Sequence, residues 1–191
     1  MAAPPTKFPA VAGVIAEFRQ ARFEPAPQAQ SGVIGLLLGL HENNVQQWDC
    51  EDAARRLDAD NRAVADAKRD IDALNAKRHD FVEAIDASLA AVIHQSPSAP
   101  PTTESPAMVF DRLSVLVIRI ASTEDAARAE RVDRDLYAER LPVLHEQLAS
   151  LQAALEALFD DLLAGRKRFV PYQSFKLYGR PESHGGDTRR D

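Results

Sequence analysis

A run of polar residues directly after the apolar segment 33–40 has the residue types and the spacing of a binding or catalytic site. If this segment is helical, five polar side chains fall on one face, at steps of three and four residues: His41, Asn44, Trp48, Asp52 and Arg55. The same face continues an apolar stripe that would point into a core, where polar groups are costly unless they bind something. We therefore interpret this helix as scaffold in its first half and as a site in its second half.

Acid–base chemistry would use the histidine and the carboxylates of this segment. A histidine exchanges a proton near neutral pH, and a carboxylate beside it can take a proton or hold an arginine. The candidate catalytic residues are His41, Glu51 and Asp52. The second histidine of a zinc-protease helix does not follow His41, and the core helices carry no di-iron pattern, so we expect no metal and no cofactor.

Ligand binding would use the amides, the tryptophan and the arginine of the same segment. Asn44 and Gln47 can form hydrogen bonds with hydroxyl or amide groups, and Trp48 offers a flat apolar face to a sugar or base ring. Arg55 lies on the same helical face, and Asn75 on the next helix could complete a pocket. The alternative is that these side chains form a buried polar network that fixes the register of the helices.

Two further positions suit a phosphate group. Arg78 interrupts an apolar face between Leu74 and Phe81, and it would need a carboxylate partner if it were buried. Asp111 and Arg112 open a strongly apolar helical segment. Either arginine could bind phosphate with charge-assisted hydrogen bonds. The ordinary alternative for these residues is surface ion pairing and helix capping.

The bulk composition limits the class of protein. The chain has 191 residues, of which 45% are hydrophobic and 27% charged, and its formal net charge is −6. These values are typical of one soluble domain with a real core, and they argue against non-specific binding of nucleic acid. We expect a cytoplasmic protein, because the single Cys50 cannot form an internal disulfide and the chain shows no signal-peptide pattern or membrane span.

Apolar periodicity places five helices in the chain. A short helix carries Val11, Val14, Ile15 and Phe18, and the site helix runs from about 32 to 57, after a cap at Ser31. A long helix extends from about 61 to 94. Its apolar face consists of Val64, Ile71, Leu74, Phe81, Ile85, Leu89 and Val92. A further helix begins at Ser105 and Pro106 and runs to about 131.

The last helix has the clearest pattern, a leucine seam at alternating steps of four and three: Tyr137, Leu141, Leu144, Leu148, Leu151, Leu155, Leu158 and Leu162. Such a seam suits antiparallel bundle packing, and Pro142 should kink or interrupt the helix. The fold class that we predict is an all-α bundle of four long helices with a short N-terminal helix. Its aromatic C-terminal tail, with Phe169, Tyr172, Phe175 and Tyr178, should fold back onto the bundle.

The domain organisation that follows is an N-terminal arm over residues 1–31, a bundle domain over 32–180 and a disordered tail over 181–191. The proline-rich linker 95–105 is long for a turn between neighbouring helices, and it would either cross the bundle or form a lid. From 165 to 191 there are seven basic and three acidic residues. This basic segment could bind phosphate or anionic lipid, or pack against the acidic body.

Five motifs of the chain resemble those of an uncharacterised bacterial family, the domain of unknown function numbered 4254. The motifs lie at 41–55, 68–86, 103–106, 111–116 and 172–178, so the resemblance covers nearly the whole chain from about 34 to 178. His79 and Ala107 stand where the family has asparagine and glycine. The resemblance implies a soluble bacterial protein, sometimes encoded near genes for cell-surface polysaccharides, and it implies no established activity.

Two functions follow as hypotheses. The first is a polar pocket between helices that binds or processes a sugar or nucleotide-sugar in cell-envelope polysaccharide metabolism. The second is a non-enzymatic interaction or adaptor protein, in which the leucine seam forms a homodimer and the polar residues are a structural network. A surface pocket that contains His41, Asn44 and Trp48 would favour the first, and complete mutual hydrogen bonding of these groups would favour the second.

Overall fold

A computed structural model of the chain describes residues 10–21, 32–55 and 61–175. These residues form five helices: α1 (Val11–Ala21), α2 (Gly32–Ala54), α3 (Asn61–Ala90), α4 (Pro106–Arg128) and α5 (Arg134–Leu163). The fold is the all-α bundle that the sequence predicts, four long helices with a short N-terminal one. Among the described residues, no helix combines the length and the apolar composition that a membrane crossing needs.

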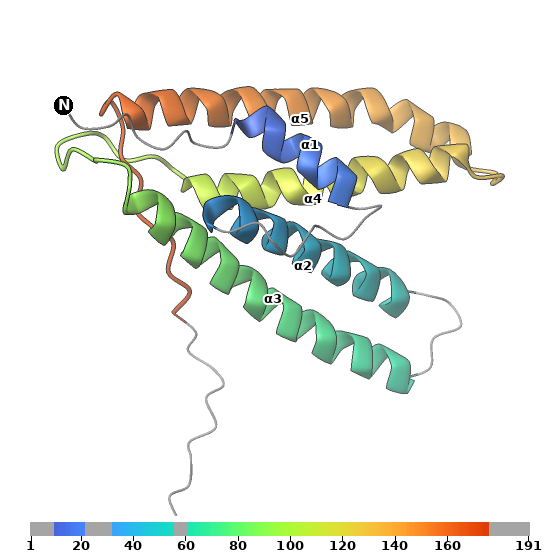
Figure 1. Ribbon diagram of the computed structural model, residues 1–191. Coiled ribbons are helices and arrows are strands. Elements are labelled where there is room, and N and C mark those ends of the chain that lie inside the picture. Colours follow the sequence, from blue (N-terminus) through green and yellow to red (C-terminus); the bar gives the residue numbers. More distant parts are fainter. Residues whose placement is uncertain (1–9, 22–31, 56–60, 176–191) are drawn as a thin grey trace, which may run out of the picture.

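The long helices form two hairpins, α2 with α3 and α4 with α5, and α1 lies across them (Figure 1). Within the described part of the chain, α4 alone packs against all four other helices. The α2–α3 hairpin packs closely at Gly39, where an added Cβ would lie 2.7 Å from the ring of Phe81. Since α3 and α5 do not pack against each other in the described structure, α4 is flanked by space between the two hairpins.

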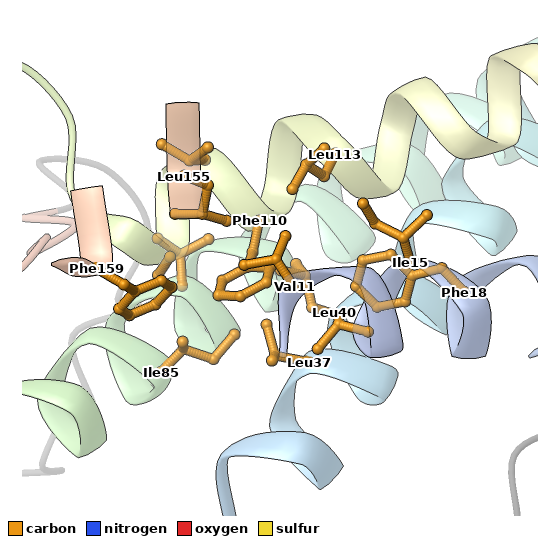
Figure 2. Close-up of a cluster of buried hydrophobic side chains, with 14 of the residues drawn as sticks. Val11, Ile15, Phe18, Leu37, Leu40, Ile85, Phe110, Leu113, Leu155 and Phe159 are labelled. Carbon is orange, nitrogen blue, oxygen red and sulfur yellow. The ribbon is translucent and has the colours of Figure 1, made fainter. Parts of the chain in front are cut away.

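The hydrophobic core is built by all five helices around α4. Figure 2 shows Phe110 and Leu113 of α4 among apolar side chains of the other helices. From α1, the side chains predicted to face the core are all buried: Val11, Val14, Ile15 and Phe18. The apolar stripe of each helix therefore places α2, α3 and α5 against α4 and fixes which polar residues can meet there.

The leucine seam of α5 packs inside the chain. Leu148, Leu155 and Leu162 are buried, and Leu144, Leu151 and Leu158 are partly buried against the same core. Of the two expected effects of Pro142, a kink or an interruption, the interruption does not occur, since α5 is one continuous helix from Arg134 to Leu163. Figure 1 shows its first turns inclined to the rest. Pro142 is exposed, so water can satisfy the backbone carbonyl that loses its hydrogen bond.

Two residues of the expected apolar face of α3 are exposed, which corrects that part of the sequence interpretation. Val64 is 40% exposed, because the first turns of α3 extend beyond α4 and have a helix on one side only. Val92 is 56% exposed, because α3 ends at Ala90 and not at the expected His94. The turn after Ala90 takes Val92 out of the helical repeat.

The buried carboxylate of Asp86 holds the ends of three segments together. Its two oxygens accept hydrogen bonds from the backbone N–H of Ala107 (3.0 Å) at the start of α4, and of Tyr172 (2.9 Å) in the C-terminal segment. Burial raises the pKa of Asp86, and hydrogen bonds from Ser105, Tyr172 and Ala107 offset this only in part. Ser105 also caps α4 by accepting a hydrogen bond from the N–H of Met108, as its sequence position predicts.

The C-terminal segment folds back onto the bundle at Phe169 and Tyr172 but not at Phe175, which corrects the sequence prediction there, and backbone hydrogen bonds join the proline-rich linker to this segment. Arg168 donates from its backbone N–H to the carbonyl of Pro100 (3.1 Å) and accepts at its carbonyl from the N–H of Thr102 (2.8 Å). Phe169 is buried, and the hydroxyl of Tyr172 forms a hydrogen bond with His79 (2.8 Å), whereas Phe175 is exposed.

The basic cluster after α5 pairs locally with the acidic body. Arg166 and Lys167 both bind the carboxylate of Asp161, each at 2.8 Å. The expectations for Ser31, Leu57, Tyr178, the arm 1–9 and the tail 181–191 fall outside the described residues.

Candidate functional site

A chain of five buried or half-buried polar side chains crosses the centre of the bundle from α2 to α3 through α4. Nδ1 of His41 lies 2.9 Å from Oγ of Ser114, and Nδ2 of Asn44 donates to the same hydroxyl at 3.1 Å. Asn44 also donates to Oδ1 of Asp111 at 2.9 Å. Both amide hydrogens of Asn44 are therefore used inside the protein.

Arg78 ends this network and connects it to the protein surface. Its guanidinium donates from Nε to both carboxylate oxygens of Asp111 at 2.9 Å, and its Nη2 lies 2.5 Å from Oδ2. The arginine side chain remains 31% exposed, and that of Asp111 only 10%. The sequence predicts that a buried Arg78 needs a carboxylate, and Asp111 on α4 is that partner. A charge-assisted pair of this geometry holds the arginine fork in one orientation.

His41 lies on the other side of this network from the residues expected to act with it. Its ring stacks on Phe18 of α1 with centroids 4.5 Å apart, and it lines a largely apolar cavity of about 310 Å³ with Val117 and Ile118. Ten residues of helix separate His41 from Glu51, which is about 15 Å along the axis. The structure therefore does not bring the three candidate catalytic residues together.

The space beside α4 forms a polar cleft, which consists of two adjoining cavities of about 360 and 710 Å³. Both cavities are lined by Arg78 of α3 and by Val115 and Arg119 of α4. The smaller cavity is otherwise lined by Asn44, Gln47, Trp48, Glu51 and Arg55. The larger cavity is otherwise lined by Arg112, Leu116, Glu146, Gln147, Ser150, Leu151 and Ala154.

The cleft gathers four arginine side chains and two glutamates along its walls. Three of the arginines are paired with carboxylates: Arg55 with Glu51, Arg78 with Asp111, and Arg112 with Glu104. Arg119 is exposed and forms no ion pair within the described part of the chain. With Glu146, these three partners match the four arginines in number, so the cleft is a cluster of arginine–carboxylate pairs in which Arg119 is the arginine without an ion pair among the described residues.

The wall of the smaller cavity contains most of the ligand-binding residues that the sequence predicts. Trp48 and Gln47 are half-buried, and the side-chain oxygen of Gln47 is buried without a hydrogen-bond partner among the described residues. A buried oxygen without a partner is costly, and the Gln47 amide would gain one by turning toward a ligand donor. Asp52 is exposed beside Arg55, and Asn75 is half-buried and lines neither cavity of the cleft.

Sequence reasoning missed Arg119 and the α5 side of the cleft. Arg119 follows Arg112 by seven residues, a spacing that places both on one side of a helix. Gln147 and Ser150 lie beside the leucine seam and not on it. Of the histidine, cysteine, aspartate and glutamate residues in the described ranges, no three are placed to hold a metal ion.

A comparison with protein-family models matches residues 35–170 to one family, described as a protein of unknown function (DUF4254). The chain belongs to this family. The match covers both hairpins except the first three residues of α2, and it includes every residue of the cleft, so the cleft and the buried network lie within the DUF4254 region. No curated protein and no solved structure matches the chain. The family has no described function, so the function must be argued from the site.

Proposed function

We propose that the protein binds or processes a phosphorylated sugar or nucleotide-sugar in the cleft beside α4. The observation that carries this proposal is the exposed guanidinium of Arg119, which has no carboxylate partner in the described structure and lies in the same cleft as Arg78. Two arginines in a concave site suit a phosphate group, because each offers several donors to its oxygens. The family resemblance adds the setting, the metabolism of cell-envelope polysaccharides.

The rest of the smaller cavity supports a ring attached to that phosphate. Trp48 lines the same cavity as the arginines, and an aromatic ring can stack on a sugar or base ring. Gln47 supplies an amide with an unused oxygen. Pockets of this kind, partly apolar with a few polar groups that fix orientation, are typical of small-molecule sites.

Binding is better supported than a particular reaction. Glu51 lines the smaller cavity but is held by Arg55, and His41 lies across the buried network. Acid–base roles for Glu51 and Asp52 would require a ligand that approaches the far end of α2. These roles stay predictions.

The alternative function, a homodimeric adaptor, shares part of this structural basis. The buried network of His41, Ser114, Asn44 and Asp111 is mutually hydrogen-bonded, as that hypothesis expects. The leucine seam, however, packs against α4 within one chain. A dimer would therefore need another surface, and the homodimer stays a prediction.

The proposed function is tested by isothermal titration calorimetry with UDP-glucose, GDP-mannose, glucose 1-phosphate and glucose. We expect at least one phosphorylated compound to bind, and glucose not to bind. Arg119→Ala should weaken binding about tenfold or more, the effect of losing one charged hydrogen bond. Arg128→Ala is the matched control, since Arg128 is exposed on the same helix and lies outside the cleft. Equal effects of the two substitutions, or binding of none of the compounds, would refute the proposal.

A further inference from the structure

The cleft is divided into two lobes that differ in chemistry and meet at a shared waist. The waist is formed by Arg78, Val115 and Arg119, which line both cavities. The small lobe, the cavity of about 360 Å³, lies against Trp48 and Gln47 of α2. The large lobe, of about 710 Å³, lies against α5. A ligand that fills both lobes must pass between the two arginines.

The α5 wall of the large lobe offers hydroxyl-binding groups. Glu146, Gln147 and Ser150 bring a carboxylate, an amide and a hydroxyl within about one helical turn of each other. Within the described residues, none of these three side chains has a hydrogen bond or an ion pair, so their full capacity is available to a ligand. A compact group of acceptors and donors of this kind suits a molecule with several adjacent hydroxyl groups.

The α2 wall of the small lobe offers the opposite chemistry. Trp48 is the only tryptophan of the chain, and it lines the small lobe together with Gln47. An aromatic face with one amide suits a planar heterocycle, because the face stacks on the ring and the amide can bind its polar edge. The two lobes thus suit two different groups, and the cationic waist lies between them.

We propose that the ligand is a nucleoside diphosphate sugar that lies across the waist, with a fixed direction. The base stacks on Trp48, the diphosphate lies between Arg78 and Arg119, and the sugar contacts Glu146, Gln147 and Ser150. This inference rests on the function proposed above, since it needs the arginines to bind phosphate. It adds the substrate class, the orientation and the residues that select the sugar.

The two ends of the ligand can be tested separately, by calorimetry with UDP-glucose against UDP and with GDP-mannose against GDP. Trp48→Ala should lower the affinity for the nucleoside diphosphate and for its sugar conjugate by the same factor, about fivefold or more. This factor is the lower end of what stacking on a base contributes. Trp48→Phe should restore most of that loss. Since Trp48 is half-buried, the melting temperature of each variant is measured in the same samples and should equal that of the wild type.

The double variant Gln147→Ala/Ser150→Ala should lower the affinity for the sugar conjugate about tenfold, because two hydrogen bonds to the sugar are lost. Its affinity for the nucleoside diphosphate should stay unchanged. Gln152→Ala is the matched control, because Gln152 is a half-buried glutamine of α5 that lies outside the cleft and forms a hydrogen bond with Glu156. If Trp48 affects only the conjugate while the α5 pair affects both compounds, the direction is reversed and the inference is wrong. If glucose 1-phosphate binds as tightly as UDP-glucose, the inference is wrong and the proposed function stands. If no phosphorylated compound binds, both fail.

Discussion

The change in stability caused by replacing Asn44 with leucine distinguishes a structural role of the buried network from a ligand-binding role of Asn44. Asn44 donates one hydrogen bond to the carboxylate of Asp111 and one to the hydroxyl of Ser114, at 2.9 and 3.1 Å. A hydrogen bond to a charged group contributes about 1.5–3 kcal/mol and a neutral one about 0.5–1.5 kcal/mol. The extra apolar burial of leucine offsets about 1 kcal/mol. Asn44→Leu should therefore lower the free energy of unfolding by about 1–3 kcal/mol.

The assay for this prediction is chemical denaturation followed by circular dichroism, with a thermal melt in parallel. For a chain of this size, the expected loss corresponds to a fall in melting temperature on the order of 5 °C. Asn75→Leu is the control, because Asn75 is a half-buried asparagine of α3 without a side-chain hydrogen bond in the described structure. It should change stability by less than about 0.5 kcal/mol. A neutral or stabilising Asn44→Leu would refute the network and show that Asn44 serves a ligand instead.

Three other predictions follow from the fold. Leu155 of the leucine seam is only 1% exposed, so Leu155→Ala should lower the free energy of unfolding by about 2–5 kcal/mol. A loss below about 0.5 kcal/mol in urea denaturation would contradict the packing of α5 on α4. Burial raises the folded-state pKa of Asp86, so its contribution to stability is present below its unfolded pKa, about 4, and is lost as pH rises through the folded pKa. The stability of the wild type relative to Asp86→Asn should thus increase when denaturation is measured at about pH 4 instead of pH 7, and a constant or opposite difference would show that the carboxylate is not the titrating group. The homodimer, which the sequence predicts and which would need a surface other than the leucine seam, should give a dimer mass in light scattering, and a monomer mass at high micromolar concentration would exclude it.

The helices could be predicted from sequence because each has a strong apolar repeat. The repeat of α5 alone identifies its buried leucines, and the four apolar residues of α1 identify its packing face. The helix ends are predicted less accurately, by four residues at Ala90 and three at Arg128, because an apolar repeat does not specify the residue at which a helix stops. The exposure of Val64 depends on how far α3 extends past α4, which no local pattern specifies.

The sequence predicts many residues of the candidate site, but it does not predict which of them contact each other or which cavity each of them lines. The need of Arg78 for a carboxylate follows from its place on an apolar face, whereas its partner Asp111 lies 33 residues away on another helix. The helical spacing places His41 and Trp48 on one face of α2, yet the two side chains line different cavities on either side of the buried network. Arg119 looks like an ordinary solvated charge in the sequence, and its place in the cleft, on which the proposed function depends, follows only from the arrangement of the two hairpins.

The central claim, that a phosphorylated ligand binds in the cleft beside α4, is tested most directly by the indole N–H signal of Trp48 in a nuclear magnetic resonance titration. Trp48 is the single tryptophan, so this signal reports one place on the wall of the cleft. We predict that UDP-glucose or GDP-mannose shifts the signal in the wild type and in Arg128→Ala, and that the shift is lost or needs at least about tenfold more ligand in Arg119→Ala. A Trp48 signal that stays unchanged at saturating concentrations of both compounds would contradict the account.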